Sequence, residues 1–389
     1  MAKSSLTLDE ALGHHGKIVK YYRCAMINQP RGWTQEQLAE AMNVSTRWVQ
    51  EIERMEFIQD INRRKALAIV LGIPAALLNI DTLEKLSERS IGLLKPVMLK
   101  RFEDSIQSRW QLYYSSSNQA TREGLIDQIE MLEQLADIGG VDERRLARIL
   151  SQHYQLAGNL ARDDFKYRRA RNYLRDALDF AREAQSPDLI ATSVTRHAVV
   201  LLRQQREEDA LRLCYEARDL ASSAQPIVRG YIYSVLAESL ARQGLQDECY
   251  RSLDLAEKFF ERARGSSLED DLAFVRLTVQ SLQDKRGECY VLSGQPWKGI
   301  EYLQVAEKLL DRNLQRDYCR LLFQQTEAFL AAGEPDICVE YAIEGLQLAR
   351  TIGSPGNINW ASEIHEKLLA SSWRNEPVVG RLGAAIVIE

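Results

Sequence analysis

The polar residues with the clearest chemical use follow Ser45, a residue type that often caps helices. Val49 and Ile52 then fall on one face of a short predicted helix. This spacing indicates that the other face could enter the major groove of DNA. That face carries side chains that can hydrogen-bond to the edges of bases, namely Thr46, Arg47, Gln50 and Glu51.

A second short helix is predicted just before this one. Thr34 can cap it, and Gln37 can complete a capping box. Leu38 and Met42 share its apolar face, and Asn43 interrupts the pattern. Two short helices joined by such a turn predict a helix-turn-helix, in which the second helix contacts the bases.

The stretch from Gly32 to Arg54 resembles the XRE, or phage-repressor-like, helix-turn-helix family, and the resemblance covers about residues 15–80. It depends on Trp33, Thr34, Gln35, Leu38, Ala39, Val44, Ser45, Val49, Ile52 and Glu53, and it continues through Ala66–Ala68 and Leu71–Ile73. The resemblance implies base contacts by Thr46, Arg47 and Glu51, with Gln50 close by. It also implies that Gln35 contacts phosphate, and we extend this expectation to Thr34, Ser45 and Arg54.

The sequence departs from the family pattern just after the second helix. Met55 replaces the usual glycine, which changes the expected helix C-cap, and Glu56 replaces a basic residue. Because an acidic side chain repels phosphate, these changes favour a weak intrinsic affinity for DNA. Trp48 stands where the family carries a small residue, and we expect it to pack against the helical core.

Further helices complete the predicted head. The first runs from His15 to Ile27, another is capped by Asp60 and ends at Gly72, and a short one covers Ala75–Asn79. We therefore predict an all-α chain with a five-helix DNA-binding domain at 1–80 and a connector at 81–96. Pro96 would mark the start of a repeat domain at 97–375, followed by a tail at 376–389.

The repeat domain is predicted from small residues that recur with offsets of 12 and 7 residues. Small residues at these positions allow two helices to cross closely and the next pair to stack on them. The pattern resembles the tetratricopeptide repeat (TPR), with spacings of 40, 39, 50 and 39 residues and an insertion near 264–271. An α-solenoid of another family is the alternative. The five sets are Gly158, Ala170 and Ala177; Ala198, Ala210 and Ala217; Ala237, Cys249 and Ala256; Gly287, Gly299 and Ala306; and Thr326, Cys338 and Gly345.

A sixth, degenerate helix pair is predicted at 97–137, and a closing helix at 357–371. The apolar tail beyond Pro377 does not continue the repeat frame and needs a cover. It could cap the last repeat or pass to a second subunit, and we slightly favour the second arrangement.

The first helix of each repeat should line the concave side of a solenoid, where such proteins bind partners. Counting from the small positions predicts a peptide-binding groove that becomes acidic toward the C-terminal repeats. The alternative is a merely solvated polar face. The predicted peptide-binding residues are Gln152, Gln155, Asn159, Arg162, Thr192, Thr195, Arg196, Tyr231, Ser234, Glu238, Asp284, Glu288, Arg320 and Glu327, and Arg203, Arg242 and Phe323 also face inward.

Composition argues against catalysis and membrane insertion. The five histidines and six cysteines show no metal-ligand spacing, and no nucleotide-binding or hydrolase motif is present. We therefore expect a protein that is not an enzyme and has no cofactor or metal. The absence of a signal segment or long apolar run leads us to expect a cytoplasmic protein. The net charge of −5 divides into +2 for residues 1–80 and −7 for the rest, which fits a DNA-contacting head on an acidic body.

An XRE-type head followed by a TPR-like body resembles the peptide-responsive RRNPP regulators of bacterial quorum sensing. This resemblance implies a cytoplasmic, homodimeric transcription regulator. A short peptide or partner protein in its repeat domain would change how the two heads fit double-stranded DNA. The competing hypothesis is a TPR adaptor whose helix-turn-helix binds proteins rather than DNA, in keeping with Glu51 and Glu56.

Overall fold

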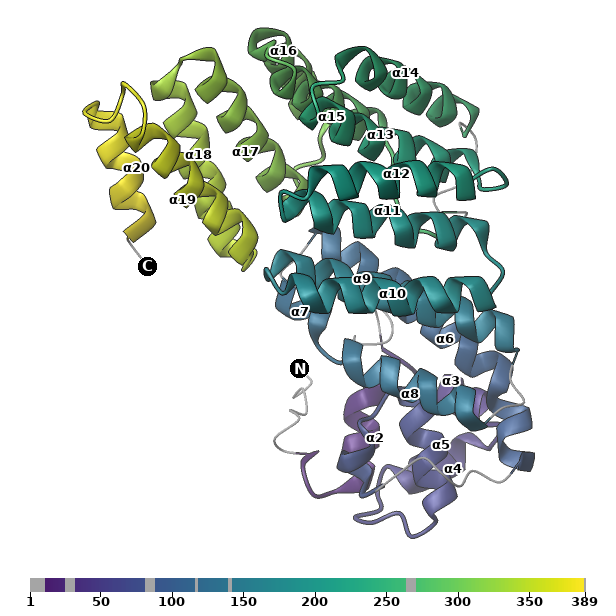
Figure 1. The fold of residues 1–389 in the computed structure, drawn as a ribbon. Coiled ribbons are helices and arrows are strands. Elements are labelled where there is room, and N and C mark those ends of the chain that lie inside the picture. The colour runs from purple at the N-terminus through teal and green to yellow at the C-terminus, as the bar shows by residue number, and fades with distance from the viewer. Residues whose placement is uncertain are drawn as a thin grey trace. The chain divides into compact units, whose positions relative to one another are not determined.

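The computed structural model describes residues 11–24, 32–80, 88–115, 118–138, 142–263 and 271–387. Throughout these ranges every regular element is a helix (Figure 1). Within the same ranges, no helix combines the length and the apolar character needed to cross a membrane. The predicted all-α class is therefore confirmed.

The chain forms two compact units. The head unit comprises residues up to 109 together with 124–153, and the repeat unit comprises 110–123 together with residues from 154 onward. This division differs from the predicted boundary at residue 80. Residues after 88 join the head because Arg101 Nη1 donates a hydrogen bond of 2.6 Å to the carbonyl of Val70, and its guanidinium covers the buried Trp33 ring.

The first helices of the head follow the capping residues in the sequence. Thr34 caps α3 with both hydrogen bonds of the capping box, and the Ser45 hydroxyl accepts from the amide of Trp48 at the start of α4. Asp60 caps α5, and Gly72 ends it in the left-handed conformation. The elements are α2 (His15–Cys24), α3 (Gln35–Met42), α4 (Thr46–Ile52), α5 (Ile61–Leu71) and the 3-10 helix η1 (Ala75–Leu78). Residues 25–27 of the predicted first helix lie outside the described ranges.

The missing glycine after α4 is compensated by backbone contacts. Glu53 ends this helix in the right-handed region, and Met55 and Glu56 offer their carbonyls to the amides of Gly16 and His15, both at 2.9 Å. A Cβ atom on Gly16 would lie 2.6 Å from the carbonyl oxygen of Ile52. Because α2 approaches so closely, its amides supply hydrogen bonds to the carbonyls after α4, where the family usually has a left-handed glycine as the helix C-cap.

The helices that follow begin earlier than predicted. Pro96 lies inside α6 and does not start the second part of the chain. Proline disfavours a helix interior because it removes an amide donor and crowds the carbonyl four residues earlier, yet α6 continues on both sides of this one. The elements are α6 (Glu88–Ser115), α7 (Asn118–Arg122), α8 (Leu125–Ile138) and α9 (Glu143–Asp163), and both α6 and α9 contribute residues to each unit.

The repeat unit consists of successive helix pairs, as the small-residue frame predicts. The first small residue of each set lies on the first helix of a pair, and the other two lie on the second helix. The helices after α9 are α10 (Tyr167–Glu183), α11 (Pro187–Arg203), α12 (Glu207–Leu220), α13 (Pro226–Arg242), α14 (Gln246–Arg262), α15 (Val279–Leu292), α16 (Pro296–Leu309), α17 (Gln315–Ala332), α18 (Pro335–Thr351), α19 (Pro355–Leu369) and α20 (Pro377–Val387).

The small positions are where paired helices touch. A Cβ atom on Gly287 would lie 2.7 Å from Leu303 Cγ and 2.9 Å from the Gly299 carbonyl oxygen, and one on Gly158 would lie 2.8 Å from Leu174 Cγ. Tyr290, three residues after Gly287, is buried beside this contact. Because one face of each first helix is in close contact at these points, its orientation is fixed, and this determines which face lines the concave side.

The C-terminal tail folds back on its own chain, so the slightly favoured subunit exchange is not what the structure shows. It forms α20, whose Val379 and Leu382 are fully buried in a core shared with α17, α18 and α19. Arg350 on α18 donates hydrogen bonds of 3.0 Å to the carbonyls of Ala385 and Ile386. The last repeat supplies enough apolar surface to cover the tail within one chain.

The packing at Gly287 predicts a sharp effect of one added methyl group. Gly287→Ala should lower the free energy of unfolding by about 1–3 kcal/mol, because the new Cβ overlaps a backbone oxygen that cannot move easily. Urea denaturation of the full chain measures this loss. Gly380→Ala is the matched control, since nothing lies within 4 Å of its added Cβ. It should raise stability by about 0.5–1 kcal/mol, as alanine does inside a helix. Equal effects of the two substitutions would contradict this account of the repeat packing.

Candidate functional site

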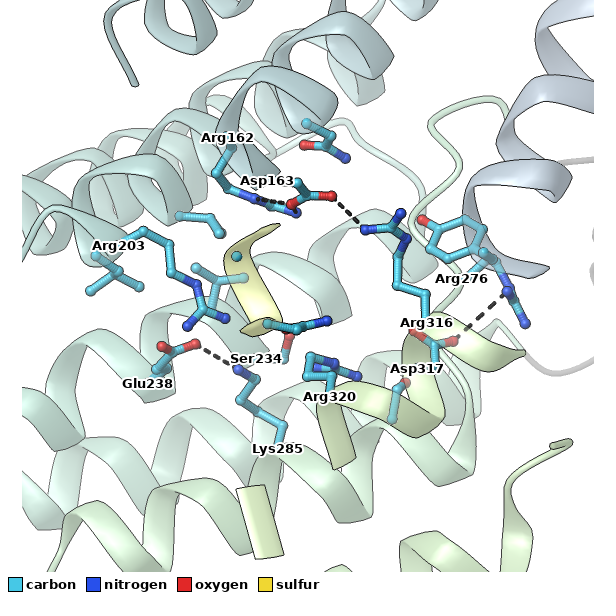
Figure 2. A pocket seen from close by; sticks show the side chains of 18 of the residues that line it. Arg162, Asp163, Arg203, Ser234, Glu238, Arg276, Lys285, Arg316, Asp317 and Arg320 are labelled. Atoms are coloured by element: carbon cyan, nitrogen blue, oxygen red, sulfur yellow. Dashed lines mark hydrogen bonds and ion pairs between the residues drawn. The ribbon is translucent and has the colours of Figure 1, made fainter. Parts of the chain in front are cut away.

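The repeat unit encloses a cavity of about 850 Å³. Its walls come from the first helices of successive pairs, from the C-terminal end of α6, and from α19. Figure 2 shows charged side chains converging on it from several of these helices. The volume lies in the usual range of about 300–1,000 Å³ for small-ligand sites.

The predicted groove residues divide into two groups. The first lines the cavity and comprises Asn159, Arg162, Arg196, Tyr231, Ser234, Glu238, Arg320 and Glu327, together with Arg203 and Arg242. The second does not line it and comprises Gln152, Gln155, Thr192, Thr195, Asp284 and Glu288, together with Phe323.

Apart from the half-buried Glu288, the members of the second group are buried between helices. The hydroxyls of Thr192 and Thr195 donate to carbonyls four residues earlier in α11, at 2.7 Å each. Gln155 accepts a hydrogen bond from Arg196 and donates to the carbonyl of Leu189 at 3.4 Å. Gln152 is also buried. Assigning these side chains to a peptide groove is therefore a correction that burial imposes on the sequence prediction.

The chain itself covers part of the concave side. Residues 271–278, which we call the strap, run without regular structure from the insertion to the start of α15. Arg196 Nη2 donates to the carbonyls of Ala273 and Phe274 at 2.8 and 3.1 Å. The Phe274 ring stacks on Trp110 with centroids 5.5 Å apart. Arg196, predicted to bind a separate peptide, thus binds two successive peptide carbonyls of its own chain.

The strap is held in a conformation that side chains rarely adopt. Phe274 and Arg276 have φ angles of 51° and 44°, in the left-handed region. Asp271 stabilises this shape by accepting a hydrogen bond of 3.0 Å from the amide of Arg276, and Arg276 lies 3.8 Å from Asp317. Contacts around the strap therefore offset its backbone strain.

The predicted acidity of the C-terminal groove is wrong, because basic partners neutralise the carboxylates. Glu238 lies 3.1 Å from Arg242 and 2.6 Å from Lys285, which also contacts Glu288 at 2.6 Å. Glu327 pairs with Lys367 at 2.7 Å, and Asp284 pairs with Arg320 at 2.6 Å.

Burial makes these pairings necessary. Burial raises the pKa of Asp284 to about 6, although Arg320 opposes the shift. Burial also opposes ionisation of Glu238, yet Lys285 and Arg242 hold the pKa of that carboxyl well below its usual value. Asp163 remains ionised in the same way, since Arg162 and Arg316 lower its pKa against the effect of burial.

Two residues that line the cavity each have one buried side-chain atom with no hydrogen-bond partner among the described residues. One is an acceptor, Asn159 Oδ1 on α9, and the other is a donor, Gln280 Nε2 on α15. The two residues are only 6% and 8% exposed. Leaving such atoms unpaired costs about 1–3 kcal/mol each, so they point to a ligand that supplies both a donor and an acceptor.

Several lining residues were not predicted from the sequence. Some of them belong to α6, the strap and α19, outside the regular repeat frame, and the others lie on the first helices α9, α15 and α17 at positions that were not counted as inward-facing. The 50-residue spacing that reveals the insertion was a signal for the strap. The missed residues include Tyr113, Tyr114, Asp163, Phe274, Arg276, Gln280, Lys285, Arg316, Asp317, Asn359 and Trp360.

The head unit exposes the predicted DNA-contacting face. Arg47 has 86% of its side chain exposed and lies 3.1 Å from Glu51, while Gln50 is also exposed and Thr46 is half-buried. Trp48 is half-buried and lies under Arg63, so it is not packed into the core. The side chains of Thr34 and Ser45 cap their helices, and Arg54 is exposed.

Gln35 lies in a network that joins α3 to α4. Its Nε2 donates to Glu53 at 2.8 Å, and its Oε1 accepts from Gln50 at 3.3 Å. Arg23 pairs with the same buried Glu53 and donates to the carbonyl of Trp33 at 2.6 Å. This network fixes the angle between the two short helices.

No protein-family model matches the chain. No curated protein matches it by sequence either. Solved structures do share its fold. A Rap protein complexed with competence and sporulation factor has a TM-score of 0.52 at 12% identity, over 90% of this chain and 86% of that chain. Aspartyl phosphate phosphatase F from Bacillus subtilis has a TM-score of 0.47 at 13% identity, over 91% and 96%. A signal-transduction ATPase with a tetratricopeptide repeat sensor from Pyrococcus horikoshii has a TM-score of 0.41 at 12% identity, over 87% and 54%. The fold is a TPR-like α-solenoid.

The strap contacts predict a local effect of removing Arg196. Arg196→Ala removes the hydrogen bonds that Arg196 donates to the Gln155 amide oxygen and to two strap carbonyls, so it should lower the free energy of unfolding by about 1–3 kcal/mol. Hydrogen–deuterium exchange should become faster by about tenfold or more at residues 271–278 and change little in α17 and α18. Arg212→Ala, at an exposed position on α12, is the control. Unchanged exchange in the strap would mean that other contacts hold it.

Proposed function

We propose that the protein is a sequence-specific DNA-binding transcription regulator whose repeat unit binds a short peptide. The observation that carries the peptide-binding part is the pair of unpartnered atoms in the cavity wall, Asn159 Oδ1 and Gln280 Nε2. A peptide bond supplies the donor and the acceptor that these atoms lack. The Rap protein with competence and sporulation factor supports ligand binding by a solenoid of this fold.

DNA binding is supported by the geometry of α3 and α4. The turn between them is closed by Asn43 in the left-handed conformation, and the polar side of α4 faces solvent. On this proposal Thr46, Arg47, Gln50 and Glu51 contact bases, and Thr34, Gln35, Ser45 and Arg54 contact phosphates. The amide of Gln35 has two hydrogens, so its bond to Glu53 leaves one for a phosphate oxygen.

We further propose that the protein acts in the cytoplasm as a homodimer. Two heads would bind two half-sites about one DNA turn apart. A peptide in the cavity would alter the fit of the heads to these sites, which couples the two binding equilibria.

A second candidate function is that of an adaptor whose head binds another protein. The observation that favours it is an exposed apolar surface after α4, with Met55 and Phe57 in the loop and Ile61 at the start of α5 exposed by 40–49%. Glu56 in the same loop would repel DNA. Retention of the full chain on a DNA column at low salt distinguishes the two functions, since the adaptor would pass through.

Substitutions in the head should separate base reading from phosphate binding. Arg47→Ala should lower affinity for a selected operator by about 1–3 kcal/mol and leave affinity for random DNA nearly unchanged, because an arginine on this face binds guanine edges. Gln35→Ala should weaken binding to both DNAs alike. The operator is first selected from a random duplex pool, and affinities are measured by fluorescence anisotropy at fixed salt. Equal losses on both DNAs for both variants would show that these roles are wrong.

Substitutions in the cavity should abolish peptide binding without unfolding the chain. A pooled hexapeptide library is passed over the full chain, and retained peptides are identified by mass spectrometry. Asn159→Ala and Gln280→Ala should each weaken binding of the retained peptides by about 1–3 kcal/mol in calorimetry, because each removes one hydrogen bond to the ligand. Asn172→Ala, at an exposed position on α10, is the control and should bind normally. Retention of no peptide, or full affinity of both variants, would contradict the proposed site.

A further inference from the structure

Three arginines form a ladder along one wall of the cavity. Arg162, Arg203 and Arg242 each lie in the last turn of an inner helix, on α9, α11 and α13 in succession, and all three line the cavity. Figure 2 shows Arg162 and Arg203 reaching into the same space. Helix C-termini favour cations, so these positions hold the guanidinium groups at modest cost.

The first and last arginines of the ladder are paired. Arg162 lies 2.9 Å from Asp163, and Arg242 lies 3.1 Å from Glu238. Among the described residues, no carboxylate lies within 4.0 Å of Arg203. Its guanidinium instead lies over the ring of Trp360, 5.4 Å from the centroid. Arg203 therefore presents to the cavity a cation that lies over the aromatic ring of Trp360.

The nearest carboxylates each have other partners. Arg203 contributes to lowering the pKa of Glu238, but the oxygens of that carboxylate contact Arg242 at 3.1 Å and Lys285 at 2.6 Å. Asp163 is shared by Arg162 and Arg316, the latter at 2.6 Å, so that carboxylate is already surrounded by cations. Glu363 and Arg203 have opposite effects on the pKa of Tyr167, so both lie near that residue. Glu363 is exposed, however, and accepts a hydrogen bond of 2.6 Å from Asn359. Asp311 also lines the cavity, is exposed, and accepts from the amide of Asn313. The wall around Arg203 thus carries more positive than negative charge.

We propose that Arg203 binds a carboxylate of the peptide. This inference rests on the proposed peptide-binding function and adds the charge of the ligand to it. A guanidinium presents a planar fork that matches a carboxylate with two parallel hydrogen bonds. The Arg203 side chain is exposed and its guanidinium lies over the Trp360 ring, so its hydrogen-bonding edge is accessible to a ligand. The carboxylate is the C-terminus of the peptide or an Asp or Glu side chain.

Two sets of matched peptides distinguish these sources. The hexapeptides retained by the full chain are resynthesised as C-terminal amides, and separately with Asn or Gln in place of Asp or Glu. One of the two changes should weaken binding by about 10- to 100-fold, the range expected for hydrogen bonds to a charged group. Loss with the amides identifies the C-terminus, and loss with the second set identifies a side chain.

Variants of Arg203 assign the effect to this residue. Arg203→Ala should bind the original peptide about 10- to 100-fold more weakly and should no longer distinguish it from its neutral analogue. Arg203→Lys should recover part of the affinity, because it keeps the charge but loses the fork. Arg175→Ala, at an exposed position on α10, is the control and should retain both affinities. Circular dichroism verifies that each variant is folded.

The outcomes separate this inference from the proposed function. The role of Arg203 is wrong if neutral analogues of the retained peptides bind with unchanged affinity, or if these peptides bind Arg203→Ala as tightly as the unaltered chain. Either result leaves the proposed peptide binding intact. Retention of no peptide by the unaltered chain overturns both. If Arg203→Ala still binds the original peptide more tightly than its neutral analogue, the carboxylate contacts another basic residue and the assignment to Arg203 is wrong.

Discussion

The close approach of paired helices at small residues is the constraint on which the repeat unit depends. Between α15 and α16 the backbone of Gly287 meets that of Gly299, with no room for a side chain. Each such contact fixes the rotation of a first helix about its axis. This rotation decides which of its polar residues face the cavity, as Asn159 and Ser234 do, and which are buried between helices, as Thr192 and Thr195 are.

Burial then decides the electrostatics of the cavity. A charge removed from water needs a partner, and Glu238, Asp163 and Asp284 each have at least one. Pairing of this kind is weak evidence for stability, but it specifies where charged side chains lie. Because most buried charges in the cavity wall are paired, the groups that lack a partner indicate what a ligand would supply. They are Asn159 Oδ1 and Gln280 Nε2, which have no hydrogen-bond partner among the described residues, and the exposed guanidinium of Arg203, which has no carboxylate within 4.0 Å in the same ranges.

The strap shows how an insertion can become part of a binding unit. Arg196 and Tyr114 together hold its carbonyls, and the stacked Phe274 and Trp110 rings fix its position. The left-handed φ angles at Phe274 and Arg276 would be unfavourable in a free loop. Part of the concave surface is therefore already filled by the chain, which confines a ligand to the remaining cavity.

The sequence by itself determined the helices, their caps and the repeat frame, because these depend on neighbours a few residues apart. Thr34, Ser45 and Asp60 cap helices as predicted, and the offsets of 12 and 7 residues locate the contacts within each pair. About half of the predicted groove residues line the cavity, since helical periodicity gives a face but not its exact limits. The rest of the site was decided by tertiary structure. Tyr113, Phe274, Arg316 and Trp360 lie far apart in the chain, and no local pattern shows that they meet. The same holds for charge: Glu238 and Lys285 are 47 residues apart, so only the folded chain reveals that the acidic residues of the groove are neutralised.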